Sequence, residues 1–227
     1  MRVLSWDVAV KSLSYCILDY IPSMTTICAW ETINVYDEGD RTCAKPTIKD
    51  DSEAVLDALI RRRDVFYRVP LDAVIVECQP GSLNNRFSNM KMKVLSHDIH
   101  AFFYTIQRMA GSGLGVNGVV IPVMFVSPNS KLTGMVTESS EDRAARQQGD
   151  RRAMGAKYRA NKKYAVDTTT ALLDQMDSSL LSTTTARAVF HSASKKDDLA
   201  DSLMLAYAFA TKSESVAIGV RKRKCET

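Results

Sequence analysis

The sequence is poor in cysteine and has no long apolar run, and both absences narrow what the chain can be. Its five cysteines are odd in number and never form a C-x-x-C pair, which argues against a disulfide framework and against a zinc site. No apolar stretch approaches the ~20 residues of a membrane span, and the first residues do not resemble a secretion signal. We therefore expect a soluble, intracellular protein with no membrane partner.

Excess charge is also small, because 30 lysines and arginines face 26 acids, for a net charge of +4. A balance this mild permits a polyanionic partner but does not require one. The cations gather in two segments, 141–163 and 221–224, which a solvated helix face or a flexible end would also explain. If the first segment and its surroundings meet nucleic acid, the residues predicted to contact phosphate are Lys131, Arg151, Arg152, Lys157, Arg159 and Lys163.

The order of apolar patterns predicts an α/β protein. Three runs rich in β-branched and aromatic residues predict an antiparallel meander at 2–9, 12–20 and 25–36. Beyond these, helices are predicted at 51–66, 86–109, about 158–176 and about 195–211, and buried strands at 71–80 and 118–128. The polar stretches 37–51 and 127–155 are predicted to be irregular. The chain should therefore form a mixed central five-stranded sheet flanked by helices on both faces.

Two acids stand in strands that are otherwise apolar. Asp7 interrupts the run RVLSWDVA, and Glu77 ends the run LDAVIVE. A lone carboxylate among such residues costs several kcal/mol unless it has a partner. A chance polar residue, or a strand end that meets solvent, remains the simpler alternative for each. Because ligands bind at strand ends in sheets of this kind, we interpret both acids as site residues.

The closing helix begins with three further acids. Asp197, Asp198 and Asp201 share one face of a helix that becomes apolar on every side from Leu203 onward. Buried anions this close together require a divalent metal or a basic partner. Asp197 also forms a capping-box pattern with Ser194, which favours a structural role for it. Asp198 and Asp201 have no such explanation, and we interpret them as metal ligands.

These acids can form one site if the strand of Glu77 lies beside the strand of Asp7 and the closing helix packs across both. The predicted ligand set is then Asp7, Glu77, Asp198 and Asp201. A site made only of oxygen ligands suits Mg²⁺, with Mn²⁺ as a substitute, and does not suit zinc. Two such ions about 3.5–4 Å apart activate water on one side of a phosphodiester and stabilise the leaving oxygen on the other. The pattern therefore indicates hydrolysis of nucleic acid.

Five motifs carry a resemblance to a known family: SWDVAVKSLSYCILD, VIVECQP, FVSPNSKL, YRANKKYAV and SKKDDLADSLMLAYAF. In them the chain resembles the Holliday junction resolvases of poxviruses and other large DNA viruses, relatives of bacterial RuvC and the yeast mitochondrial resolvase. The resemblance implies a ribonuclease H-like fold and a magnesium-dependent homodimer that makes paired cuts across a four-way DNA junction, in the cytoplasm or nucleus of an infected cell. It covers nearly the whole chain, with 37–51 and 139–155 as insertions, and departs at Ala9, where such enzymes commonly have glycine.

The resemblance also implies a functional lysine near the basic segment, and Lys162 in NKKYAV is the candidate catalytic lysine. Such a cation would stabilise the charge that builds at the scissile phosphate. Residues 1–215 are predicted to form the nuclease domain, with 216–227 as a flexible basic tail. Two other functions remain open: a ribonuclease H-like nuclease acting on RNA–DNA hybrid, and a non-catalytic nucleic-acid-binding protein.

A four-way junction needs two active sites related by a two-fold axis, so we expect two chains. The helix predicted at 86–109 carries more apolar surface than one sheet face can cover. We expect this helix to contribute to the dimer interface, with Phe102 and Phe103 either in the core or at that interface. Its apolar side chains are Met90, Met92, Val94, Leu95, Phe102 and Phe103. His97 and His100 on the same helix have the spacing of a metal pair, but no third ligand accompanies them.

Overall fold

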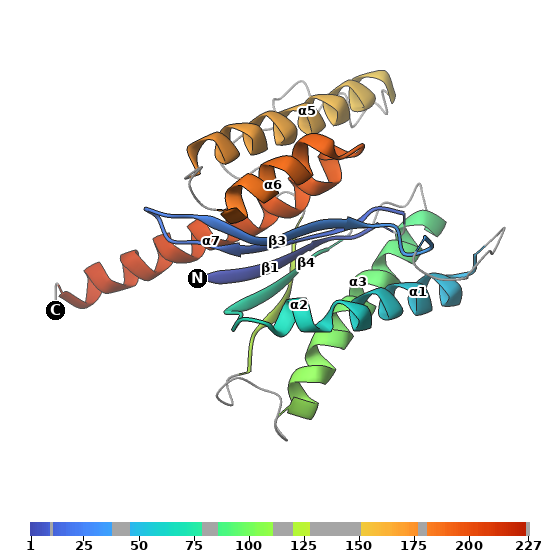
Figure 1. Ribbon diagram of the computed structural model, residues 1–227, viewed down its shortest axis with the longest axis horizontal. Coiled ribbons are helices and arrows are strands. Elements are labelled where there is room, and N and C mark those ends of the chain that lie inside the picture. The colour runs from blue at the N-terminus through green and yellow to red at the C-terminus, as the bar shows by residue number, and fades with distance from the viewer. Residues whose placement is uncertain are drawn as a thin grey trace.

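The computed structural model contains one central sheet with helices stacked on both of its faces (Figure 1). It describes residues 1–9, 11–37, 46–78, 86–110, 120–127, 151–176 and 181–225. Side chains are described over the same ranges except at 86–89, 110, 151–158, 181–183 and 215–225. Within the described ranges, no helix is long and apolar enough to cross a membrane.

Five strands make up the sheet in the described part of the chain. They are β1 (Arg2–Asp7), β2 (Leu13–Asp19), β3 (Thr26–Ile33), β4 (Ala73–Glu77) and β5 (Val123–Val126). In space their order is β3-β2-β1-β4-β5, with β2 antiparallel to β1 and β3, and β4 parallel to β1 and β5. The predicted meander and the predicted mixed sheet are confirmed. The strands of Asp7 and Glu77 are neighbours, as the predicted site requires.

β5 forms one edge of the sheet and is less buried than its sequence predicts. The run 118–128 is almost continuously apolar, which is typical of a strand covered on both faces. In the structure β5 pairs with β4 alone, and the Phe125 side chain at its centre is 37% exposed. The prediction of a fully buried strand is wrong, because an apolar run identifies a strand but not its position at an edge.

The helices that cover one face of the sheet are α1 (Ile48–Arg61), α2 (Arg63–Tyr67) and α3 (Arg86–Ala110). The single helix predicted at 51–66 is in fact two, because the backbone at Arg62 leaves helical geometry between α1 and α2. α1 also begins earlier than predicted. Thr47 and Asp50 form a capping box, in which each side chain accepts a hydrogen bond from the other residue's backbone N–H. The last residues of the stretch 37–51 are therefore helical.

The helices that cover the opposite face are α5 (Arg151–Gln175), α6 (Leu181–Ser192) and α7 (Lys196–Cys225). α5 begins before the predicted helix, so the end of the stretch 127–155 is helical and not irregular. The sequence does not predict α6, whose threonines favour helix only weakly. Packing stabilises α6 instead, since Phe190 stacks on Trp30 of β3 with ring centroids 5.3 Å apart. α7 continues past the predicted end at 211, and a separate tail at 216–227 stays a prediction.

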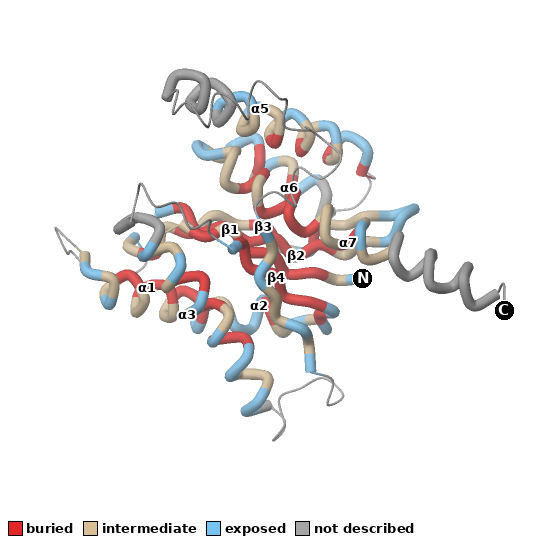
Figure 2. Tube along the Cα trace, turned by 180° about the vertical axis from the view of Figure 1, so that it is seen from behind, coloured by how far each residue is buried: buried red, intermediate tan, exposed pale blue. Residues whose placement is uncertain are grey.

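Each face of the sheet has its own hydrophobic core, and Figure 2 shows both as buried segments on either side of the strands. The first, which we name the aromatic core, lies against α1, α2 and α3. In it the Trp6 ring lies 5.1 to 6.2 Å from the rings of Tyr15, Phe66 and Phe103. The second, which we name the α7 core, lies against α5, α6 and α7 and contains many small side chains. Those that α7 contributes are Ala200, Ala206 and Ala210. Small side chains allow the backbone of α7 to approach the sheet closely.

Candidate active site

The two predicted strand acids lie at the carboxyl ends of neighbouring parallel strands. Asp7 is the last residue of β1 and pairs in register with Ser14 of β2. Glu77 is the last residue of β4, directly after the residues of that strand that pair with β1. The carboxyl ends of neighbouring parallel strands lie at the same end of a sheet. Asp7 and Glu77 therefore stand at the same end of the fold.

Both acids and Ser14 belong to the face of the sheet that α7 covers. Side chains alternate between the two faces along a strand. Ser5 of β1 donates a hydrogen bond to a backbone carbonyl of α7, and Ile75 of β4 belongs to the α7 core. Asp7 and Glu77 each lie two residues further along the same strand, so they face the same way. The Ser14 hydroxyl contacts α7 directly.

α7 brings the remaining acids to this end of the sheet. Asp197 and Asp198 lie in its first turn, and Asp201 follows one turn later. α7 packs against both β1 and β2. The Ser14 hydroxyl donates to the backbone carbonyl of Asp198 at 2.6 Å, and Ser14 is also the register partner of Asp7. The strands of Asp7 and Glu77 are neighbours and α7 packs against β1, as the site predicted from the sequence requires, but the main sheet contacts of α7 are with β1, β2 and β3 and not with β4.

Asp198 is a buried acid with one oxygen that accepts no hydrogen bond. Its side chain is 14% exposed, and the buried Oδ2 has no hydrogen-bond partner. Burial raises the pKa of Asp198, and the negative charges of Asp197 and Asp7 raise it further. A hydrogen bond from the Ser12 side chain and the charge of Lys195, whose Nζ lies 3.8 Å from Oδ2, act in the opposite direction. Three carboxylates thus influence one another at the end of β1.

This donor set suits a hard divalent cation, because it consists of carboxylate oxygens and includes a buried oxygen that accepts no hydrogen bond and has only the more distant Lys195 ammonium near it. Glu77, which is 6% exposed, ends β4 on the same face, and Asp201 lies one turn beyond Asp198. Among the side chains that the structure describes, no three Asp, Glu, His or Cys groups are close enough together to hold a metal ion. The structure places the predicted ligands at one end of the sheet, and their joint ligation of an ion stays a prediction.

Lys162 reaches the acids from α5. The buried residues of this helix recur at helical spacing, at Ala165, Thr169 and Leu173. Lys162 lies one turn before them and therefore faces α7, where its ammonium forms an ion pair with Asp197. The sequence assigns a capping role to Asp197, and the structure gives it this ion pair in the first turn of α7. The predicted catalytic lysine thus contacts one of the acids at this end of the sheet. We name these acids the acid cluster, and they are Asp7, Glu77, Asp197, Asp198 and Asp201.

Exposed cations flank the cluster on α5 and at the start of α7. Arg159 and Lys163, both predicted to contact DNA, are exposed one turn apart on α5. Lys195, which precedes α7 and is not among the predicted DNA contacts, has a side chain that is 58% exposed. The other predicted DNA contacts have side chains outside the described residues: Lys131, Arg151, Arg152 and Lys157.

Two serines that contact Asp198 are absent from the predicted site. Ser12 hydrogen-bonds the Asp198 side chain, and Ser14 hydrogen-bonds its backbone carbonyl. Both serines are buried, at 5% and 0% exposed. The sequence carries a signal for Ser14, because it is the one small hydroxyl in the strand LSYCILD, and a buried hydroxyl requires a hydrogen-bond partner. Only the fold reveals that this partner lies on α7.

The sheet covers part of the apolar surface of α3 and leaves part exposed. Leu95, Phe102 and Phe103 belong to the aromatic core, which decides between the core and the interface for the two phenylalanines, whereas a contribution of α3 to a dimer stays a prediction. The large apolar side chains that α3 leaves exposed are Met90, Tyr104 and Met109. His97 and His100 pack on Phe125 of β5, with ring centroids 4.9 and 5.0 Å apart, and this packing accounts for their spacing without a metal.

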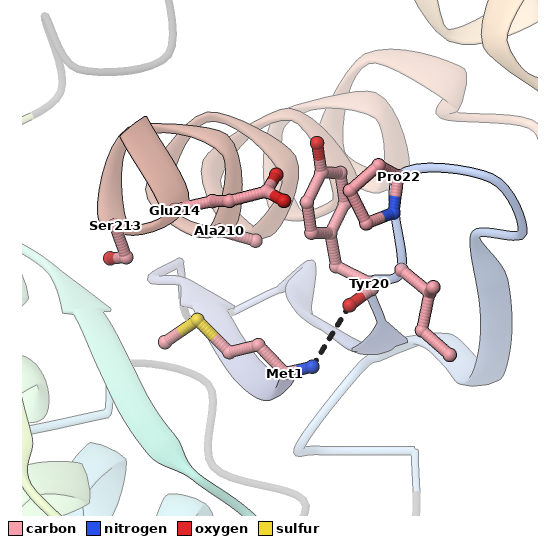
Figure 3. Close-up of a pocket in the computed structure, with 7 residues that line it drawn as sticks. Met1, Tyr20, Pro22, Ala210, Ser213 and Glu214 are labelled. Carbon is pink, nitrogen blue, oxygen red and sulfur yellow. Dashed lines mark hydrogen bonds between the residues drawn. The ribbon is translucent and has the colours of Figure 1, made fainter. Parts of the chain in front are cut away.

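A pocket of about 400 Å³ lies far from the acids, between the turn after β2 and the later part of α7 (Figure 3). Its lining includes Met1, Tyr20, Pro22 and one acid, Glu214, which stands beside Tyr20. Glu214 is separated from Asp198 by roughly 24 Å of helix, and none of the residues that line the pocket belongs to the acid cluster. The pocket has a single carboxylate in a mainly apolar lining, so it lacks the group of carboxylates found at the end of β1.

Comparison with known proteins finds similarity in structure and not in sequence. Neither a protein-family model nor a curated protein matches the chain. The yeast mitochondrial Holliday junction resolvase Ydc2 superposes with a TM-score of 0.59 and 16% identity, over 91% of this chain and 78% of that one. The fowlpox virus resolvase in complex with Holliday junction DNA gives 0.52 and 18%, over 93% of this chain and 98% of that one. T. thermophilus RuvC in complex with a Holliday junction substrate gives 0.50 and 14%, over 95% and 96%.

At such identities these similarities establish the fold. The chain has the mixed five-stranded sheet with flanking helices of these resolvases, and the predicted ribonuclease H-like fold is confirmed. The similarity spans nearly the whole chain.

Proposed function

We propose that the protein is a metal-dependent endonuclease that resolves four-way DNA junctions by paired cleavage of phosphodiester bonds. One observation carries the proposal: the carboxylates of β1 and α7 gather at the carboxyl end of β1 around Asp198, whose buried Oδ2 has no hydrogen-bond partner. The fold supports the choice of substrate. Three solved structures that share it are Holliday junction resolvases, two of them in complex with junction DNA.

In this proposal four acids have one role, to hold Mg²⁺ or Mn²⁺ at the end of the sheet, and they are Asp7, Glu77, Asp198 and Asp201. The bound ion would supply Lewis acidity and an activated water for attack on phosphorus. Lys162, held beside the cluster by Asp197, would lie near the scissile phosphate and stabilise the charge that develops on it. Ser12 and Ser14 hold Asp198 in place.

The DNA would approach across α5 and the start of α7. Arg159, Lys163 and Lys195 present exposed positive charge on either side of the acids, and phosphate contacts of this kind supply most of the affinity of nucleic-acid-binding proteins. Replacing Arg159 and Lys163 together with alanine should weaken junction binding and reduce the slope of log affinity against log salt by up to about 2. Fluorescence anisotropy at several salt concentrations measures both. An unchanged slope would show that this side of α5 faces away from DNA.

We also propose that two copies of the chain act together, since paired cuts on a symmetric junction require two sites. The exposed side chains of Met90, Tyr104 and Met109 on α3 and of Phe125 on the edge strand offer an apolar surface for a second copy. Light scattering should give twice the mass of 25.2 kDa. A mixed dimer with one Asp201→Asn subunit should nick a cruciform plasmid without linearising it.

The deciding experiment offers the protein a synthetic four-way junction, a linear duplex of the same sequence and an RNA–DNA hybrid, each with and without Mg²⁺. We expect paired cuts in the junction alone, only with Mg²⁺, and none by the Asp198→Asn variant. Cleavage of the hybrid without cleavage of the junction would replace the proposal with a ribonuclease H activity. Junction binding without cleavage under any condition would indicate a non-catalytic binding protein.

A further inference from the structure

The hairpin between β1 and β2 makes two different contacts with Asp198, the acid at the centre of the cluster. The fully buried Ser14 donates its hydroxyl to the Asp198 backbone carbonyl at 2.6 Å. Ser12, at the start of the same strand region, hydrogen-bonds the Asp198 carboxylate. One residue of α7 is thus held by its main chain and by its side chain, from two serines that are two positions apart in the sequence and face the same helix.

The Ser14 contact sets the position of α7 relative to β1. Ser14 is the register partner of Asp7, so the same residue is tied to one acid through the β1–β2 ladder and to the other through its hydroxyl. A carbonyl in the first turn of a helix already accepts the intrahelical bond from the residue four positions later. The Asp198 carbonyl therefore does not need the additional bond from Ser14 to be hydrogen-bonded within the helix. Its effect is to fix how far and in which rotation the start of α7 stands above Asp7.

The Ser12 contact sets the orientation of the carboxylate. A carboxylate has two oxygens and can rotate about its terminal torsion. The hydrogen bond from Ser12 engages one side of the group, while Oδ2 stays buried and accepts no hydrogen bond. An oxygen that is held in place and accepts no hydrogen bond is suited to a cation. The Lys195 ammonium, 3.8 Å away and beyond hydrogen-bond distance, is on an exposed side chain, so no protein hydrogen bond has to be broken when the ion arrives.

We propose that Ser12 and Ser14 are positioning residues that preset the distance and orientation between Asp198 and Asp7 for a divalent cation. The inference rests on the proposed metal-dependent function and deepens it, since it assigns the geometry of the site to the hairpin. Neither serine is a metal ligand in this proposal. Ser14 acts through the backbone of α7, and Ser12 acts through the Asp198 carboxylate.

The sheet offers a matched control one turn further along α7. Ser5 of β1 is also fully buried and donates its hydroxyl to an α7 backbone carbonyl, that of Ser202, at 2.6 Å. Ser5→Ala and Ser14→Ala therefore remove the same kind of bond, of the same length, between the same sheet face and the same helix. The two variants should lose similar thermal stability. They differ in that Ser5→Ala leaves both contacts to Asp198 in place.

The test measures Mn²⁺ binding to the full-length protein without DNA, by the electron paramagnetic resonance signal of the unbound ion. Ser12→Ala and Ser14→Ala should each raise the Mn²⁺ dissociation constant roughly 10-fold or more, the usual effect of removing a group that orients a metal ligand. Ser5→Ala should change it less than about 2-fold at a similar Tm, and Ser12→Thr, which keeps the hydroxyl, should restore it. Ser12→Ala leaves the bonds from Ser5, Ser14 and Trp30 to the α7 backbone intact, so it tests the idea even if Ser14→Ala fails to fold.

Two outcomes would overturn the inference, and they are distinguishable. If the unmodified protein binds Mn²⁺ and Asp198→Asn abolishes that binding, but the serine variants match Ser5→Ala, the serines are structural and the proposed function stands. If the unmodified protein binds no Mn²⁺ at the cluster, so that Asp198→Asn changes nothing, the proposed metal site fails and the inference fails with it.

Discussion

The two faces of the sheet are held to their helices in different ways. On the aromatic core side, large rings fill the space, and most of the polar contacts are ion pairs between side chains, although the Ser96 hydroxyl of α3 also donates to the backbone carbonyl of Glu77 at 3.3 Å. Asp51 of α1 pairs with Lys91 of α3 at 2.8 Å and accepts a hydrogen bond from Tyr36. Glu31 of β3 pairs with Arg62 at 2.6 Å. These pairs join side chains to side chains, so they adapt to small shifts of the helices.

On the α7 side, polar groups of the sheet hydrogen-bond the backbone of the helix. Ser14 donates to Asp198, Ser5 to Ser202, and the Trp30 Nε1 to Leu199 at 3.0 Å. A backbone carbonyl cannot rotate to follow its donor, so each of these bonds specifies one position of α7. On the aromatic core side, the volume of the side chains determines how the helices pack. On the side that carries the acids, hydrogen bonds to the helix backbone determine where α7 lies.

The strongest test of this difference replaces acids on the two sides. Asp7→Asn, Glu77→Gln, Asp198→Asn and Asp201→Asn should each reduce junction cleavage at least ~100-fold, since an ion that stabilises the transition state contributes several kcal/mol. Junction binding should survive, because the phosphate-contacting cations remain. Asp64→Asn, on α2 with a side chain 94% exposed, is the control that should cleave normally. Near-normal turnover at low Mg²⁺ in any of the four would remove that residue from the site.

For Asp51→Asn on the aromatic core side we expect the opposite result, a loss of stability with cleavage unchanged. The Asp51 side chain is 1% exposed and holds Lys91 and Tyr36, so its loss should cost about 2–4 kcal/mol of unfolding free energy, with a partly exposed Lys91 softening the effect. Urea denaturation measures this change. Cleavage per folded molecule should stay normal. Lys49→Gln, which breaks an exposed pair with Glu53, should cost less than about 0.5 kcal/mol. If Asp51→Asn instead abolished cleavage in a stable protein, the two faces would not divide stability from chemistry.

A smaller loss is expected at Arg187 of α6, which holds backbone carbonyls on the α7 side of the molecule. Its guanidinium donates to the carbonyls of Leu173 and Met176 at the end of α5. Arg187→Ala should lower the unfolding free energy by about 1–3 kcal/mol, because charged hydrogen bonds to helix ends are lost. Arg187→Lys should recover part of it, since one ammonium can still reach one carbonyl. Equal Tm values for Arg187→Ala and the unmodified protein would show that these bonds contribute nothing.

The smallest expected effect is a gain in stability. Burial and the charges of Asp197 and Asp7 raise the pKa of Asp198, so the folded state binds a proton there more tightly than the unfolded state does. Stability therefore falls as pH rises through this pKa. Without metal at neutral pH, Asp198→Asn should therefore raise Tm. The gain should vanish as the pH falls below the pKa of an unfolded aspartate. A gain that persists in acid would have another cause.

The sequence alone predicts the fold and most of the candidate site for a physical reason. Asp7 and Glu77 are anions in apolar strands, and the acids of α7 precede a helix that is apolar all round, so each conflicts with its local pattern. Such conflicts are visible in the sequence itself and indicate where a site lies. The order of strands follows from the meander and the later alternation of helix and strand. Convergence of all four carboxylates on one ion depends on rotamers, which no sequence pattern specifies.

What the sequence could not predict depends on tertiary contacts. α6 is held by the stack of Phe190 on Trp30 and not by helix propensity. The burial of Phe102 and Phe103 depends on which side of α3 meets the sheet, and both rings could equally have faced a partner. The hydroxyl of Ser14 finds its acceptor on a residue 184 positions away. Separations of this size leave no local signal.

That separation also determines when the active site can form during synthesis. The buried residues of the aromatic core all lie between Leu4 and Phe103, so this core can assemble while the rest of the chain is still being made. The α7 core needs Val3 and Ala210 together, and the acid cluster needs Asp7 and Asp198. Contacts between such distant residues form late, because closing a long loop is slow. A nascent chain can therefore carry one finished core before its acid cluster exists, and under the proposed function the capacity to cut DNA would arrive with the last helix to dock.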